Sequence, residues 1–167
     1  MKKTIILLVI CISSTLSKGQ ELLNTDSINN VFKETLQKSR NAVSNATNSW
    51  RYDNSKEDYF KRDTIVLNTA RSYKTEYCNG VNWSFYTERN FILEFIHYCN
   101  EPPTKDISRK KDYMKMRIKK MGEKIYLQLI NRDGLFDSFE ILDLRKNKPL
   151  EGYEIEFDYT IVLVRKK

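Results

Sequence analysis

The sequence has 167 residues, of which 29 are basic and 22 acidic, and its net charge is +7. This length suits one ordinary domain with a sizeable hydrophobic core. No internal repeat, low-complexity tract or interdomain linker interrupts the sequence, which excludes repeat proteins and chains built of several domains. A single histidine and three cysteines restrict the metal and redox chemistry that the chain can support.

Residues 1–19 have the three parts of a secretory signal peptide. Two lysines follow the first methionine, residues 5–12 (IILLVICI) form an apolar run too short to span a bilayer, and small residues lead up to a cleavage position before Gln20. We therefore expect these residues to be removed, which leaves a secreted or periplasmic protein with no membrane span. A buried N-terminal segment of the core is the alternative interpretation.

Removal of the signal peptide changes both the charge and the cysteine count. The remaining chain has 26 basic and 22 acidic residues, so its net charge falls to +4. That excess is too mild to favour nucleic acid as a partner. Cys11 is lost, whereas Cys78 and Cys99 remain. Two cysteines in an exported protein more often form a disulfide than stay as free thiols.

The segment from residue 20 to about residue 48 has helical periodicity. Its apolar residues recur mostly at steps of three and four, which makes one stripe. The stripe consists of Ile28, Val31, Phe32, Leu36, Ala42, Val43, Ala46 and Trp50. Asp26 and Ser27 are the candidate N-caps. We expect the stripe to pack against the mouth or outer wall of the following domain, and a polar leader without fixed structure is the alternative. Residues 50–62 are charged and are interpreted as a connection, so residues 20–62 precede the main domain.

From residue 63 onward, apolar and polar residues alternate, which is the pattern of strands with one buried face. The eight predicted strands lie near residues 64–68, 72–78, 81–87, 91–98, 112–119, 124–130, 136–143 and 153–165. Short, turn-like links join them, as at Gly80 and Gly122. The sequence therefore predicts a mostly β fold over residues 63–167. We expect about eight antiparallel strands in up-and-down order, closed into a barrel and preceded by the helix.

The hairpin formed by residues 81–98 has a register that its apolar residues predict. Pairing positions that sum to 178 places Trp83 opposite Phe95 and keeps each face of the hairpin either apolar or polar. Cys78 and Cys99 then lie one step out of register, a separation that a disulfide tolerates where strands end. The bridge would close a loop of about twenty residues, worth roughly 3 kcal/mol in the chain-entropy model.

Five segments of the predicted barrel are similar to those of a known family. They are residues 82–85 (NWSF), 90–93 (NFIL), 124–129 (KIYLQL), 139–144 (FEILDL) and 159–163 (YTIVL). On these segments the chain, over residues 64–165, resembles the lipocalin-like proteins that Bacteroidetes-type bacteria export. The Gly-x-Trp of true lipocalins is absent, because Trp50 follows Asn48 and Ser49. The resemblance implies an extracytoplasmic binding barrel without catalysis, and it implies no particular ligand.

A barrel of eight strands has room for one small ligand. We expect the binding site to be lined by the side chains Trp83, Phe85, Phe95, His97, Met116 and Tyr159. The rings and the methionine would supply apolar contact, while the histidine and the tyrosine would orient the polar part of a small apolar or amphipathic ligand. The alternative is that these side chains fill the core.

The sequence favours binding over catalysis. His97 is the only histidine, so a transition-metal site lacks ligands, and no nucleophile stands in a recognisable turn motif. We predict a protein that is not an enzyme and has no cofactor. The second candidate is a periplasmic inhibitor or immunity-type protein that binds another envelope protein. It would use the loop of residues 100–111 and the basic face of Lys115, Arg117 and Lys119, which is otherwise a solvated outer face.

Overall fold

The computed structural model of the protein describes residues 23–41, 49–69, 77–147 and 159–166. Within these ranges the chain forms one α-helix, α2 (Thr25–Asn41), a short 3-10 helix, η1 (Lys110–Asp112), and nine strands. The strands are β1 (Ser49–Asp53), β2 (Thr64–Asn68), β3 (Asn79–Thr87), β4 (Asn90–His97), β5 (Thr104–Lys105), β6 (Tyr113–Met121), β7 (Lys124–Asn131), β8 (Gly134–Lys146) and β9 (Tyr159–Arg165). No helix in this part of the chain is long and apolar enough to cross a membrane.

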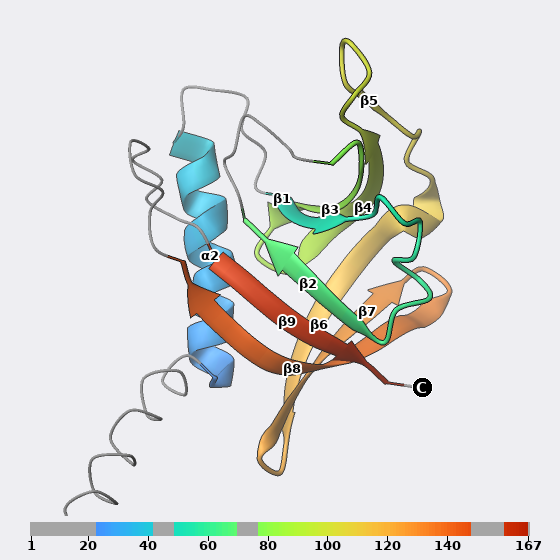
Figure 1. The fold of residues 1–167 in the computed structure, drawn as a ribbon. Helices are drawn as coiled ribbons and strands as arrows, with labels where there is room; N and C mark the ends of the chain where they lie inside the picture. The colour runs from blue at the N-terminus through green and yellow to red at the C-terminus, as the bar shows by residue number, and fades with distance from the viewer. Residues whose placement is uncertain (1–22, 42–48, 70–76, 148–158, 167) are drawn as a thin grey trace, which may run out of the picture.

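The strands close into an eight-stranded antiparallel barrel, as the sequence predicts (Figure 1). Their order around the barrel is β3-β1-β2-β9-β8-β7-β6-β4, and pairing between β4 and β3 closes the ring. Each of these neighbouring pairs is antiparallel. β5 is a two-residue strand that pairs with the last residues of β4. Closure leaves none of the eight strands as a fully unpaired edge.

β1 is a strand in a segment that the sequence analysis interpreted as a connection. Only Trp50 and Tyr52 alternate with charged residues there, and so short a pattern does not identify a strand. β1 lies between β2 and β3, which are successive in the chain but are not neighbours. All other successive strands of the eight are neighbours, as in an up-and-down barrel. Residues 72–76 and 153–158 of the predicted strands lie outside the described residues.

The β3–β4 hairpin has a different register from the predicted one. Trp83 lies opposite Leu93, so the prediction that it pairs with Phe95 is wrong. A two-residue turn joins the strands, and a bulge between Phe85 and Thr87 adds one residue to β3. A bulge of this kind shifts the pairing by one position. The shift keeps the apolar side chains on one face, so the alternation was interpreted correctly and the pairing register was not.

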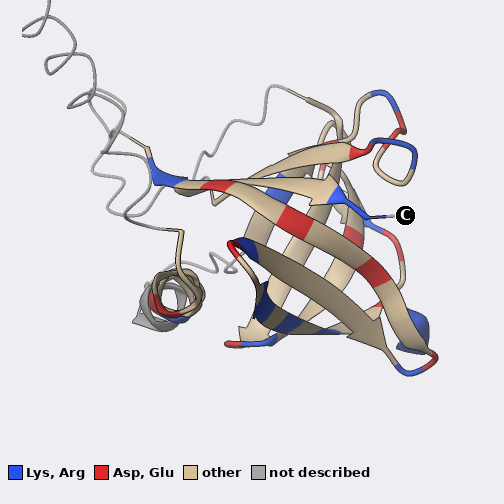
Figure 2. Ribbon diagram, turned by 90° about the horizontal axis from the view of Figure 1, so that it is seen from below, with Lys and Arg blue, Asp and Glu red and all other residues tan. Residues whose placement is uncertain are grey.

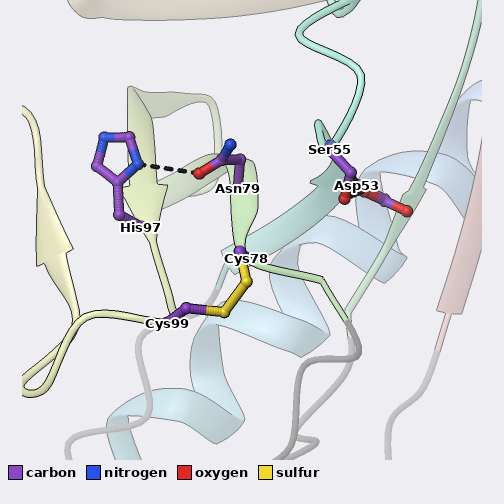
Figure 3. Close-up of a disulfide and its surroundings, with 6 residues drawn as sticks. All are labelled: Asp53, Ser55, Cys78, Asn79, His97 and Cys99. Atoms are coloured by element: carbon purple, nitrogen blue, oxygen red, sulfur yellow. Dashed lines mark hydrogen bonds between the residues drawn. A yellow bond between two sulfur atoms is a disulfide. The ribbon is translucent and has the colours of Figure 1, made fainter.

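A disulfide joins Cys78 and Cys99, as predicted. Their Cα atoms are 4.9 Å apart, and the Tyr98 N–H donates to the Cys78 carbonyl oxygen at 2.7 Å. The bridge lies just beyond the last ladder pair of the hairpin, Asn79 with His97 (Figure 3). The two cysteines are one step out of register, at the place where the strands end. Disulfides of this kind are typical of proteins in oxidising compartments.

Helix α2 begins at an asparagine cap. The Asn24 side-chain Oδ1 accepts from the Ser27 backbone N–H at 2.7 Å, which satisfies one of the free amides of the first turn. The predicted caps, Asp26 and Ser27, are therefore wrong, since both residues lie inside the first turn. The predicted helix extends to about residue 48, and residues 42–48 lie outside the described part of the chain.

Helix α2 covers one end of the barrel, here named the closed end (Figure 1). Its buried side chains are Ile28, Val31, Phe32, Thr35 and Leu36. The Phe32 ring lies 4.9 Å from the Trp50 ring of β1 and 5.1 Å from the Phe85 ring of β3. The Tyr159 hydroxyl, at the start of β9, donates to Glu34 at 3.1 Å. The part of the apolar stripe that lies in α2 therefore packs on the barrel mouth, which is one of the two predicted placements. Trp50, which the sequence pattern assigned to the stripe, belongs to β1 instead.

Between its ends the barrel is filled by large side chains. The Trp83 indole is fully buried and stacks on the Phe91 ring, with the ring centroids 4.9 Å apart. Its N–H donates to the Tyr59 hydroxyl at 2.9 Å, so the one polar atom of the indole is satisfied inside the core. The core also contains the buried side chains Ile65, Leu67, Met114, Met116, Leu127, Leu129, Phe139, Ile161 and Leu163.

The double substitution Cys78→Ser with Cys99→Ser is expected to lower the free energy of unfolding by roughly 3 kcal/mol. The physical reason is that the bridge joins residues 21 positions apart and restricts the unfolded chain. Urea titration of the oxidised parent and of the variant, followed by tryptophan fluorescence, measures the difference. If both chains unfold at the same urea concentration, the bridge does not stabilise these strand ends.

A second prediction concerns Glu140 of β8. Its carboxylate lies 2.6 Å from the Lys166 Nζ and 3.0 Å from the Lys124 Nζ. These hydrogen bonds lower the pKa of the Glu140 carboxyl below its ordinary value. The stabilisation is therefore present above the unfolded pKa of about 4.3 and is lost as the pH falls through the lower folded pKa.

Glu140→Gln is expected to unfold more easily than the parent at neutral pH, with the difference shrinking in acid. Urea midpoints measured along a pH series test this expectation. A gap between the two chains that stays constant into strong acid would contradict it.

Candidate functional site

The six residues predicted to line a ligand site lie at three levels of the barrel. Trp83 and Met116 are in the packed middle and are fully buried. Phe85 and Tyr159 are at the closed end, where both contact helix α2. The remaining two are on the last residues of β4, at the opposite end, here named the open end. Within the described ranges, the six side chains therefore do not surround one cavity.

Phe95 and His97, the two at the open end, border a pair of hollows. The larger is named the mouth hollow and has a volume of about 500 Å³; it is lined by Phe60, Leu93, Phe95, Lys111, Asp112, Phe136, Asp137 and Arg165. The smaller is named the histidine hollow and has a volume of about 260 Å³; its lining includes Tyr59, Asn79, His97 and Asp106. Phe60 and Phe95 line both, so the two hollows adjoin at these rings.

Three phenylalanines from different elements form the apolar surface of the mouth hollow. The Phe60 ring, in the β1–β2 loop, lies 6.0 Å from the Phe95 ring of β4 and 6.2 Å from the Phe136 ring of β8. Phe60 is 53% exposed, and Phe136 is also exposed. Exposed aromatic rings that converge on a hollow are typical of binding sites, because they offer apolar contact at little conformational cost.

A gap in the barrel wall explains why the mouth hollow forms there. β4 pairs with β6 only along residues 90–92, and beyond that point the wall is continued by β5, η1 and the segment between them. The Asp106 N–H donates to the Phe95 carbonyl oxygen at 3.0 Å, which holds this segment against β4. Beyond residue 92, β4 is therefore not flanked by a regular strand, and Leu93 and Phe95 line the mouth hollow there.

An ion pair forms the floor of the mouth hollow. The Arg165 Nε donates to the Asp137 Oδ2 at 2.9 Å, and the two side chains are only 12% and 11% exposed. The Arg165 Nη1 donates to the backbone carbonyls of Tyr59 at 3.1 Å and Arg62 at 2.6 Å. The guanidinium also lies 5.2 Å from the centre of the Phe139 ring. One arginine thus ties β9, β8 and the β1–β2 loop together.

The surroundings of the Arg165–Asp137 pair shift the pKa of the Asp137 carboxyl. Burial raises the pKa of the Asp137 carboxyl above its ordinary range, and the effect of Arg165, which acts in the opposite direction, is smaller. The Arg165 Nη2 is buried and has no hydrogen-bond partner among the residues that the structure describes. The floor is therefore polar and nearly dry, whereas the rim above it is aromatic.

The loop that carries Phe60 is anchored by its neighbours. The Tyr52 hydroxyl of β1 donates to the Asp58 carboxylate at 2.7 Å, and the Arg62 Nε donates to the same carboxylate at 2.6 Å. Burial and the hydrogen bond to Asp58 raise the pKa of Tyr52 to about 12. Tyr59 is buried in the core beside Trp83. Phe60 therefore projects from a loop whose flanking residues are fixed.

His97 lies on the rim of the barrel and is not in the core. Its side chain is 46% exposed, and its Nδ1 lies 3.0 Å from the Asn79 Oδ1 (Figure 3). Since an amide oxygen only accepts, Nδ1 carries the proton. The Nε2 lies 3.6 Å from the Asp106 Oδ1, too far for a hydrogen bond. No group of three histidine, cysteine or acidic side chains that would hold a metal is present in the described ranges.

Three residues that shape the mouth hollow were not predicted from the sequence: Phe60, Phe136 and Arg165. Phe60 lies in a charged segment without periodicity, so nothing in the pattern marks it. Arg165 has a recognisable signal. It follows Ile161 and Leu163 at steps of two and continues the buried face of β9, so its charge is placed toward the interior. A charged residue on a buried face is usually paired with an opposite charge or has a structural or functional role.

Comparison with known proteins adds no family to this description. No protein-family model matches the sequence, and no curated protein or solved structure is significantly similar to it. The assignment of the chain as an eight-stranded barrel therefore rests on the strand pairing itself.

Proposed function

We propose that the protein is an exported, non-enzymatic binding protein of lipocalin-like type that holds a small amphipathic ligand at the open end of its barrel. The observation that carries this proposal is the mouth hollow, in which three phenylalanine rings converge above a buried ion pair. Its volume of about 500 Å³ lies within the range of small-molecule sites, roughly 300–1,000 Å³.

The difference between the two ends of the barrel supports a ligand site at the open end. Helix α2 covers the closed end, and the middle is filled by Trp83 and its neighbours. A ligand would therefore enter from the open end and lie on Phe60, Phe95 and Phe136. Its polar group would meet Lys111 and Asp112, which border the same hollow. In this arrangement the deep residues Trp83 and Met116 support the site from below instead of touching the ligand.

Binding fits the site better than catalysis does. The rings offer contact area, whereas the charged groups at the floor, Arg165 and Asp137, are paired with each other. His97 has one nitrogen hydrogen-bonded to Asn79, and no serine, threonine or cysteine is among the residues that line the two hollows. The resemblance to exported lipocalin-like proteins of Bacteroidetes type belongs to the same proposal, as does the signal peptide, and the disulfide supports an oxidising compartment.

A specific observation also favours the second candidate, an inhibitor or immunity-type protein that binds an envelope protein. The middle of the barrel is packed, and apolar side chains at the open end reach into solvent, including Ile107 on the segment after β5 and Leu135 at the start of β8. A partner protein would cover these side chains together with Phe60 and Phe136. Native mass spectrometry of the protein purified from the exporting cells separates the candidates. A small-molecule adduct favours the first, and a protein adduct favours the second.

The ligand proposal is tested with 1-anilinonaphthalene-8-sulfonate, an amphipathic aromatic probe. Phe60→Ser combined with Phe136→Ser is expected to weaken binding of the probe by at least about tenfold, since partial loss of two ring contacts amounts to roughly 1.4 kcal/mol or more. Fluorescence titration measures the affinity. Both side chains are exposed, so the barrel is expected to keep its stability.

Tyr86→Ser is the matched control, because Tyr86 is a ring of similar exposure, 47%, that belongs to β3 and lies outside both hollows. Its removal is expected to leave the affinity unchanged. Equal loss of affinity in the control and in the double variant would mean that the probe does not occupy the mouth hollow, and the proposal would fail.

A further inference from the structure

The hairpin of β6 and β7 extends beyond the strands beside it. The Met116 N–H donates to the Arg89 carbonyl oxygen, in the β3–β4 turn, at 2.7 Å, so contact with β4 ends there. β6 continues for five more residues to Met121, and β7 pairs with β8 only from Tyr126 onward. The tip of the hairpin therefore projects from the barrel, as the lower edge of Figure 1 shows.

The outer face of this hairpin carries a row of cations. Lys115, Arg117 and Lys119 are exposed, and they alternate with side chains that face the core. Because a strand rises about 3.4 Å per residue, successive cations in the row are roughly 6.8 Å apart. Lys120 follows at the tip and is also exposed. Figure 2 shows blue bands along this part of the wall.

The residues beside the row do not neutralise it. Across the ladder on β7 lie Ile130, Gln128 and Tyr126, none of which is acidic. On the β4 side, Asn90 lies opposite Lys115. No ion pair to Lys115, Arg117, Lys119 or Lys120 is present among the described residues.

Lys124, on the other strand of the hairpin, provides the contrast, because it is paired with Glu140. The only acid of the hairpin itself is Glu123, in the turn. The row is therefore a concentration of positive charge that lacks a described counterion.

Apolar side chains are exposed beside these cations. Met121, at the tip, is 64% exposed. Leu142 of β8 is 49% exposed, and it lies two residues past Glu140, toward the same end of the barrel as the tip. Cations beside an exposed apolar side chain match the chemistry of a lipid surface, where phosphates lie directly above acyl chains. An acidic polymer would account for the cations but would offer no apolar contact to Met121.

We propose that residues 115–121, here named the basic hairpin, dock the protein on an anionic lipid surface. Lys115, Arg117, Lys119 and Lys120 contact lipid phosphates, and Met121 enters the headgroup layer. The mouth hollow is at the open end of the barrel, whereas the tip of the hairpin is at the closed end. Docking therefore leaves the hollow accessible, and this proposal does not depend on what the hollow binds.

The test uses the chain from Gln20 onward, the predicted mature form, so that the apolar residues 5–12 do not contribute. Vesicles of phosphatidylcholine are compared with vesicles in which phosphatidylglycerol replaces about a third of it, and sedimentation measures the bound fraction. The parent is expected to bind only the anionic vesicles. Its binding is expected to weaken with added salt, because the Debye length falls from about 10 Å at 0.1 M to about 3 Å at 1 M.

The triple variant Lys115→Gln, Arg117→Gln and Lys119→Gln is expected to lose about a hundredfold in partitioning, at roughly fivefold per charge near the surface. Its matched control is Lys56→Gln, Lys61→Gln and Lys110→Gln, which removes the same charge from exposed side chains at the open end. The control is expected to stay within about twofold of the parent. Met121→Ser, with all cations kept, is expected to lose on the order of tenfold.

Three results would overturn the proposal. The first is a parent that does not bind anionic vesicles at low salt. The second is equal loss in the two triple variants, which would mean that net charge, and not the basic hairpin, attracts the protein. The third is a Met121→Ser variant that binds as tightly as the parent, which would indicate a purely electrostatic partner such as an acidic protein or polymer. Circular dichroism of each variant establishes that the barrel is folded.

Discussion

Inside the barrel, the Trp83 indole N–H donates to the Tyr59 hydroxyl, and much of the open end depends on this hydrogen bond. The bond joins the centre of β3 to a residue of the β1–β2 loop. Tyr59 is fully buried, which raises the pKa of its hydroxyl and keeps it neutral. Its backbone carbonyl accepts from Arg165, which in turn pairs with Asp137. The loop is thus held from the core below and from β8 and β9 at the side, and Phe60 is placed by its neighbours on both sides.

The two ends of the barrel are closed by different physical means. At the closed end, an amphipathic helix lays one apolar stripe on Trp50 and Phe85, and the contacting side chains are buried. At the open end, short irregular segments are held by polar contacts such as the Arg165 pair, and aromatic side chains stay at the surface. A hollow forms where packing is incomplete, and the open end is therefore where we propose that a ligand binds.

The barrel, the covering helix and the disulfide were predictable from the sequence because they depend on patterns that repeat. Alternation over β6, β7 and β9 identifies strands in any context, and two cysteines at the ends of a hairpin indicate a bridge. β1 was missed because five residues with two charges carry too little pattern. The β3–β4 register was missed because a bulge depends on one extra residue near Phe85.

The candidate site was the least predictable part. Trp83 and Met116 were correctly placed on an inward face, but the inward face of a barrel is mostly core. Which inward residues meet a hollow depends on where the wall opens, and that is set by the end of the β4–β6 ladder. Phe60 and Arg165 come together only in three dimensions, from positions more than a hundred residues apart. No local pattern contains that information.

The position of β1 between β2 and β3 has a consequence for the order of folding. β2 completes its pairing with β9, a partner nearly a hundred residues later in the chain, and β1 receives hydrogen bonds from strands on both sides that come after it. Such distant pairings are slow to form, because a long stretch of chain must be ordered before they contribute. The ring cannot close before β9 is available. Until then β2 presents an open edge, and during folding that edge must be kept from joining another chain.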